Sequence, residues 1–145
     1  ASASAVLLKN KGGVLPLPRG QTVGLVGSAC FRPHNIAPDG DWRAGDYYVV
    51  GGSGRVISPE VDVLSIAQAL TAKGVSLVTS ATDDVHDALS VADRVDILVA
   101  CGGATSTESL DRPHLRLDQH VFLVGLADAL AADPKPEKPP LVIAA

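Results

Sequence analysis

The chain has 145 residues, of which 46% are hydrophobic and 19% charged, and its formal net charge at pH 7 is −4. This length suits one domain with its own core, and the composition excludes disorder over most of the chain. The negative charge and the 12 scattered Lys and Arg residues argue against nucleic acid as a partner, and no apolar run approaches the roughly 20 residues of a membrane-spanning helix.

The first part of the chain predicts one strand between two irregular segments. Residues 14–18 (VLPLP) cannot form a central strand because proline lacks an N–H, so we expect an extended arm over the body. Residues 22–27 predict the first core strand. Residues 30–59 show few regular signals yet hold three of the five aromatic side chains, so we interpret this long loop as functional.

The next part predicts a helix followed by a strand. Ser58-Pro59-Glu60 has the N-cap, proline and acidic first-turn pattern of a helix start. Apolar residues at three- and four-residue steps continue this helix until Gly74 stops it. Residues 75–79 predict the second strand.

A helix and a buried strand come next. Asp83 or Asp84 is expected to cap a helix that continues to Ala92. Residues 95–101 (VDILVAC) form an almost continuous apolar run, which is typical of a strand buried on both faces of a parallel sheet.

The last part predicts a further helix and strand. Asp118 offers an N-cap to a helix that ends near Ala132, and a proline-rich connector follows over residues 133–140. Leu141 then begins one more buried strand.

This alternation of strands and helices predicts an α/β fold: a doubly wound, mostly parallel sheet in a three-layer sandwich. No helix follows the last strand to cover the sheet, so we expect the sandwich to be incomplete at its C-terminal end. The chain also begins without Met or a signal-peptide pattern, which indicates a mature terminus or the cut end of a longer protein. Residues 1–145 are therefore interpreted as a single, partial domain.

Cys30 and Cys101 lack metal-ligand spacing, and each follows or ends a predicted buried strand. We favour two buried free thiols, with a disulfide or a shared ligand pair as the alternative. The cysteines therefore do not show whether the protein works in an oxidising or a reducing compartment.

The loop after residue 101 carries Glu108 and then the pair Asp111-Arg112. Open α/β sheets bind ligands outside the carboxyl ends of their strands. We therefore expect any chemistry to lie at Glu108.

Other motifs argue against a cofactor or a metal. Gly24-Leu25-Val26-Gly27 lacks the full dinucleotide-binding pattern, and the loop of residues 51–55 lacks the Gly-Lys-Ser/Thr ending of a phosphate-binding loop. No two of the four histidines stand four residues apart, and no HExxH motif occurs. We predict no cofactor and no metal.

Five short motifs occur along the chain. The first two are VLLKN with VLPL, within residues 6–17, and VGLVG at 23–27. The others are GGSGRV at 51–56 with Ser58-Pro59, DILV at 96–99, and ESLDR at 108–112, which is followed by Leu115, Leu117 and Gln119. Together they resemble the second domain of glycoside hydrolase family 3, the β-glucosidase and β-xylosidase family.

The resemblance implies part of a retaining, β-glucosidase-like enzyme that hydrolyses terminal β-linked sugars of a β-glucoside or an oligosaccharide. In that family an aspartate nucleophile lies on a separate (β/α)8 barrel, and a loop of the second domain commonly supplies the general acid/base glutamate. The matching position here is Glu108. The barrel would come from the same or a neighbouring chain, and the isolated chain is expected to hydrolyse nothing.

The resemblance also assigns roles around Glu108. Trp42, Gly52, Ser53 and Arg55 would border the sugar, while Asp111 and Arg112 would support the loop as a local ion pair. Ser109 stands where the signature has glycine and is expected to restrict the backbone. Partial desolvation against a neighbouring domain would raise the pKa of Glu108, as a general acid requires.

Such an enzyme would be secreted, periplasmic or vacuolar. The alternative is a non-catalytic scaffold module of the same fold, docked in a larger assembly through its uncovered sheet edge. A third alternative is a flavodoxin-like or Rossmann-like binding domain, which bound flavin or nucleotide absorbance would reveal.

Overall fold

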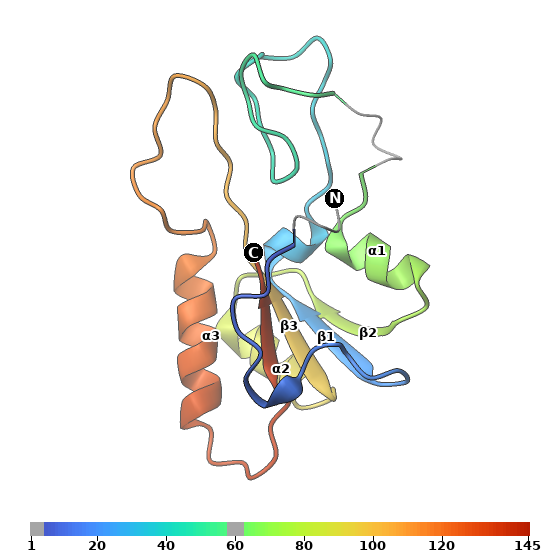
Figure 1. Cartoon of the computed structure of the whole chain (residues 1–145). Coiled ribbons are helices and arrows are strands. Elements are labelled where there is room, and N and C mark those ends of the chain that lie inside the picture. Colours follow the sequence, from blue (N-terminus) through green and yellow to red (C-terminus); the bar gives the residue numbers. More distant parts are fainter. Residues whose placement is uncertain (1–4, 58–62) are drawn as a thin grey trace.

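The computed structural model describes residues 5–57 and 63–145. Its centre is a sheet of four parallel strands in the order β2-β1-β3-β4. The strands are β1 (Thr22–Val26), β2 (Ser76–Ser80), β3 (Ile97–Cys101) and β4 (Leu141–Ala144), as Figure 1 shows. The predicted parallel sheet is confirmed.

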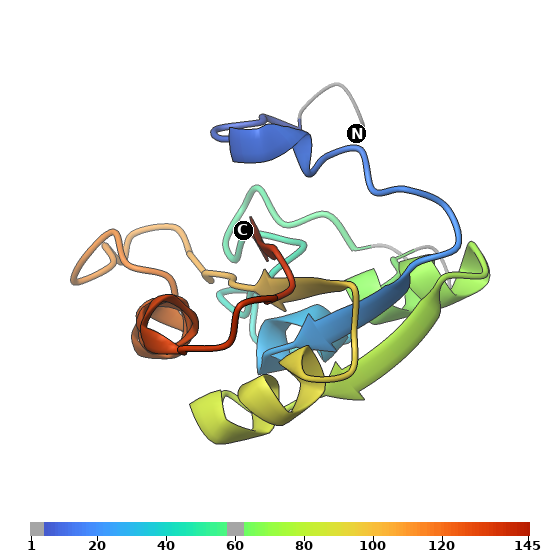
Figure 2. The ribbon, with the colours of Figure 1, turned by 90° about the horizontal axis from the view of Figure 1, so that it is seen from below.

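Helices cover both faces of the sheet, which gives the three layers expected from the sequence. The α-helices are α1 (Ile66–Ala72), α2 (Val85–Ala92) and α3 (His120–Ala132), and the short 3-10 turns are η2 (Lys11–Gly13) and η3 (Ser28–Phe31). In Figure 2, α2 and α3 lie on one side of the sheet, and the N-terminal arm lies on the other.

Two apolar clusters hold the layers together. On one face, Leu98 and Val26 of the sheet pack with Leu126 of α3 and Ala88 of α2. On the other face, Leu25 and Val99 pack with partly buried side chains of α1 and with Leu17 of the arm. Residues 14–18 form no strand, so the expectation of an arm packed on the body is confirmed.

Helix starts follow local capping chemistry in two cases. The Asp84 carboxylate accepts a hydrogen bond from the Asp87 backbone N–H, which confirms the predicted cap of α2. Ser65 and Gln68 form a capping box at the start of α1. The predicted helix start at residues 58–60 lies outside the described residues, and residues 63–65 are not helical, so the described helix begins later than the periodicity indicated.

Two predictions about the later elements are wrong. Asp118 does not cap α3: the residue before that helix is Gln119, which makes no side-chain cap, and the Asp118 carboxylate is used by Tyr47 and Arg112 instead. Strand β4 is partly exposed rather than buried, because it pairs only with β3 and forms an edge of the sheet.

The sheet order places a switch point between β1 and β3. From β1 the chain passes through α1 to β2 on one side, and from β2 it returns through α2 to β3 and then to β4 on the other. The loops after β1 and β3 therefore rise side by side from the carboxyl edge, as Figure 1 shows. Open α/β sheets bind ligands at such a point.

Candidate active site

Glu108 lies in the loop after β3, where a tight turn presents it. Thr107 and Leu110 form an antiparallel bridge, so Glu108 and Ser109 are the two central residues of that turn. Ser109 has φ +64°, in the left-handed region that favours glycine. The family signature's glycine therefore has a physical reason, and Ser109 adopts the same backbone at a cost in strain.

The loop of residues 51–55 runs directly against this turn. The Glu108 N–H donates to the Gly51 carbonyl oxygen at 3.1 Å, and the Gly51 N–H donates to the Ser106 carbonyl oxygen at 2.9 Å. Two segments more than fifty residues apart in the sequence are thus joined by backbone hydrogen bonds. This fixes the position of Glu108 without help from a regular sheet.

Ser53 holds the Glu108 carboxylate. Its backbone N–H and its hydroxyl both donate to Oε2 of Glu108, at 2.7 and 2.5 Å. The side-chain hydrogen bond from Ser53, followed by the backbone one, lowers the pKa of the exposed Glu108 carboxyl below its ordinary value. Desolvation acts in the opposite direction but more weakly, because the carboxyl group is exposed. The higher pKa expected against a neighbouring domain stays a prediction for the complete enzyme.

Glycine is required where the two segments meet. Gly52 has φ +104°, and a Cβ on it would lie 2.3 Å from the Cβ of Glu108. A Cβ on Gly51 would lie 2.0 Å from the carbonyl oxygen of Arg43. Any larger residue at either position would force the two loops apart.

The structure brings the backbone of Trp42 to this junction. The Gly52 N–H donates to the Trp42 carbonyl oxygen at 2.8 Å. Trp42 is 47% exposed, and the Arg43 guanidinium lies over its indole ring, 5.3 Å from the ring centroid. The backbone of Trp42 is thus tied to the Glu108 junction, and its partly exposed ring has an apolar face.

Arg55 is engaged within its own loop. Its Nη1 donates to the Asp41 carbonyl oxygen at 2.7 Å, and its backbone N–H donates to the Gly52 carbonyl oxygen at 3.0 Å. These contacts close the loop around Ser53. Arg55 therefore acts on the shape of the loop in this structure.

The expected ion pair between Asp111 and Arg112 is wrong. In the described part of the chain Arg112 lies 3.6 Å from an oxygen of Asp118, and it also donates to the Arg116 carbonyl oxygen at 2.5 Å. Adjacent residues in an extended loop point their side chains apart, whereas the chain returns to bring Asp118 back to Arg112. Arg112 does tie the loop together, as expected, but through a different partner.

A buried pair that the sequence reasoning missed anchors the long loop after β1. His34 is 2% exposed, and its Nδ1 lies 2.7 Å from Oδ2 of Asp46. Burial opposes the ionised form of Asp46, but hydrogen bonds from Tyr48, His34, Asn35 and Val49 outweigh it and lower the pKa of that carboxyl. The Asp46 carboxylate thereby fixes the backbone that leads into residues 51–55.

A second network joins both loops to the sheet. Oε1 of Gln119, which is buried, accepts from the Gly103 N–H at 3.0 Å, and its Nε2 lies 2.9 Å from the Tyr47 hydroxyl. The same Nε2 lies 3.3 Å from the Ser28 hydroxyl, which donates to Asp83 at 2.7 Å. Gln119 stood in the motif after Glu108, but nothing local in the sequence showed that it would connect four segments.

A disulfide joins Cys30 to Cys101, so the favoured prediction of two free thiols is wrong and the alternative is correct. The two Cα atoms are 5.2 Å apart, because η3 follows β1 directly and β1 pairs with β3 along its length. The bond lies at the base of both loops. It links the starting points of the two segments that meet at Glu108.

The sequence profile of the Glycosyl hydrolase family 3 C-terminal domain matches residues 5–140. The chain belongs to this family.

A solved structure supports the fold of this family 3 domain. The crystal structure of beta-D-glucoside glucohydrolase from Trichoderma reesei superposes with a TM-score of 0.70 at 22% sequence identity, over 95% of this chain. The match spans 21% of that protein's chain, so this domain corresponds to about one fifth of the neighbour's length. No curated relative with significant sequence similarity was found.

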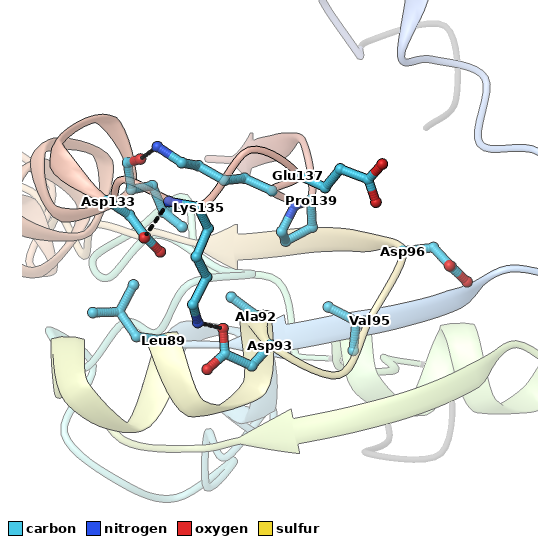
Figure 3. A pocket seen from close by; sticks show the side chains of 11 residues that line it. Leu89, Ala92, Asp93, Val95, Asp96, Asp133, Lys135, Glu137 and Pro139 are labelled. Carbon is cyan, nitrogen blue, oxygen red and sulfur yellow. Dashed lines mark hydrogen bonds and ion pairs between the residues drawn. The ribbon is translucent and has the colours of Figure 1, made fainter.

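The larger of the two cavities described in the family 3 domain lies far from Glu108, at the amino end of the sheet (Figure 3). It measures about 580 Å³ and is bounded by the ends of α2 and α3 and by the proline-rich connector. Both of its lysines are bonded within the domain: Lys135 pairs with Asp93, and Lys138 donates to the Leu130 carbonyl oxygen at 2.8 Å. A smaller hollow of about 410 Å³ lies at the carboxyl end, against Tyr47 and Gly103.

One cluster on the surface has the side chains of a cation site. Asp84, His86 and Asp87 each bring one potential ligand atom within 4.8 Å of the others, but the contacts of the two aspartates are those of a helix start. Within residues 5–57 and 63–145, no helix is both long and apolar enough to cross a membrane.

Proposed function

We propose that this family 3 domain supplies Glu108 as the general acid/base of a retaining β-glycosidase that acts on terminal β-linked sugars. The observation that carries the proposal is the contact between two family motifs: Ser53 of the glycine-rich loop holds the carboxylate of Glu108. The carboxylate is exposed at the switch point of the sheet, where open α/β sheets bind ligands.

The chemistry requires a second carboxylate, which we propose comes from a (β/α)8 barrel. In the first step that carboxylate bonds to the anomeric carbon while Glu108 gives its proton to the departing glycosidic oxygen. In the second step Glu108 takes a proton from water, whose oxygen bonds to the anomeric carbon as the carboxylate leaves. The two carboxyl groups would stand about 5–5.5 Å apart.

The segment around Glu108 suits a sugar site. Trp42, which is 47% exposed, would offer its ring to the apolar face of a sugar. The backbone of Gly52 and Ser53 would border the same sugar, because Ser53 holds the carboxylate that reacts with it. Arg55 shapes this loop, and Arg112 steadies the opposite one. We propose Trp42, Gly52, Ser53 and Arg55 as the wall of the sugar site, with Arg112 as support for the loop that carries Glu108.

We further propose that the enzyme works in an oxidising compartment: outside the cell, in a periplasm or in a vacuole. The support is the buried disulfide between Cys30 and Cys101, since disulfides persist in oxidising surroundings and are rare in reducing ones.

The test uses the complete polypeptide that contains these residues, whose length an intact mass measurement establishes. Glu108→Gln should lower kcat/KM for an alkyl β-glucoside by about 10²–10⁴-fold, because a poor leaving group needs the proton. For a dinitrophenyl β-glucoside, whose leaving group needs no proton, the first step should be nearly unaffected.

Glu137→Gln is the matched control, because this glutamate lies on the connector at the opposite end of the sheet. It should leave both rates unchanged. Equal activity of Glu108→Gln and the unsubstituted enzyme on the alkyl glucoside would overturn the acid/base role and favour a scaffold function.

A further inference from the structure

The Glu108 carboxylate receives hydrogen bonds at only one of its two oxygens within the described residues. Ser53 gives two donors, its N–H and its hydroxyl, and both go to Oε2. Within the described residues no hydrogen bond reaches the other carboxylate oxygen, Oε1. Ser53 thus holds the carboxyl group at Oε2, and Oε1 is free of hydrogen bonds from the described residues.

The two donors of Ser53 differ in what they tolerate. A backbone N–H can only donate, so its bond favours the ionised carboxylate. A hydroxyl can also accept, so it can turn to receive the proton of a neutral carboxylic acid. Ser53 can therefore stay bonded to Glu108 in both protonation states, although its two bonds together favour the charged one.

No other described group competes with Ser53. Gly51 accepts a hydrogen bond from the backbone N–H of Glu108, and Gly52 has no side chain that could reach the carboxylate. None of the charged groups of the two loops makes an ion pair with Glu108 within the described residues; these groups are Asp41, Arg43, Arg55, Asp111 and Arg112. Protonation of Glu108 is consequently governed by one residue.

We propose that Ser53 is a positioning residue that orients Glu108 through Oε2 and sets the balance between its acid and base forms. This inference rests on the proposed function for its meaning in catalysis. A neighbouring domain that covers the carboxyl group would favour its neutral form by desolvation. The Ser53 bonds oppose that effect, so that the same side chain can give a proton in one step and take one in the next.

The test follows Glu108 directly by NMR in the complete polypeptide. Selective ¹³C labelling of glutamate carboxyl carbons gives one signal for each glutamate, and Glu60, Glu108 and Glu137 are those of this domain. Loss of one signal in Glu108→Gln assigns it. The titration midpoint of Glu108 is then compared in the unsubstituted chain, Ser53→Ala and Ser53→Thr.

The expected result is a rise in the Glu108 midpoint in Ser53→Ala and its return in Ser53→Thr, which restores the hydroxyl. The midpoint of Glu137 should stay fixed in all three proteins, which separates the local effect from a change of fold. Ser53 is exposed, so neither substitution disturbs a core. An unchanged midpoint in Ser53→Ala would overturn the inference.

The outcome is separable from that of the proposed function, because the titration needs no activity. In the complete enzyme, a raised midpoint should also move the alkaline limb of the kcat/KM profile to higher pH in Ser53→Ala. If the titration midpoint of Glu108 moves in Ser53→Ala but Glu108→Gln keeps full activity, the effect of Ser53 on Glu108 is confirmed and the catalytic role of Glu108 is wrong.

Discussion

The two ends of the sheet differ in how their polar groups are used. At the amino end the larger cavity is lined by charged side chains that pair with one another or bond to helix ends, as Lys135 and Lys138 do. At the carboxyl end the cavity is smaller, yet two loops are joined there by backbone hydrogen bonds. A residue of one loop, Ser53, holds the exposed Glu108 carboxylate of the other.

This difference shows that cavity size alone does not locate chemistry in this domain. Lysines near helix C-termini are placed where the helix dipole favours positive charge, which is a structural role. A carboxylate that two distant segments hold in a defined position is a feature that local stability does not require. Four substitutions test the contrast, from the largest expected effect to the smallest.

Removing the disulfide should have the largest effect on stability. Replacing both Cys30 and Cys101 with Ala should lower the free energy of unfolding by about 2–5 kcal/mol, because the bond closes a long loop in the unfolded chain. The separation of the two residues is 71 positions. Thermal unfolding followed by circular dichroism should show a Tm lower by roughly 5–20 °C. Equal Tm values under oxidising and reducing conditions would contradict the bond.

Gly52→Ala should disturb the position of Glu108 directly. Its Cβ would overlap the Cβ of Glu108, and its φ of +104° is strained for alanine, so a loss of about 1–3 kcal/mol is expected. Gly54→Ala is the matched control, because a Cβ there meets only a methyl of Val50 at 3.8 Å. The Glu108 carboxyl signal in NMR should move in the first variant and stay in the second.

Ser109→Gly should stabilise the domain slightly. Relief of the left-handed backbone at φ +64° is offset in part by the greater freedom of glycine in the unfolded chain. A net gain of about 0.5–1 kcal/mol is expected in urea unfolding, with an unchanged slope. A loss of stability would show that the Ser109 side chain makes a contact of its own.

Lys135→Ala should have the smallest effect. Its pair with Asp93 is exposed on both sides, and such surface pairs contribute little. Neither Tm nor activity of the complete enzyme should change beyond experimental error. A clear loss of activity would assign a functional role to the amino-end cavity, and the proposed division between a structural amino end and a functional carboxyl end would be wrong.

The sequence by itself determined the order of strands and helices. The apolar run that ends at Cys101, the cap at Asp84 and the prolines of the arm each act within a few residues, so local patterns were enough to predict them. The family strings also pick out Glu108 and the loop of residues 51–55. They do so because a special backbone conformation restricts the residue type: the positive φ of Gly52, for example, favours glycine.

Only the tertiary structure decided which distant residues meet. Cys30 forms a disulfide with Cys101, and His34 pairs with Asp46. Arg112 pairs with Asp118 and not with its neighbour Asp111. Parallel strands and returning loops bring these residues together. The same holds for Ser53 and Glu108, and for the lowered pKa of that carboxyl, which depends on two hydrogen bonds across the loops. Contacts between residues far apart in the chain leave no local pattern, so sequence periodicity carries no trace of them.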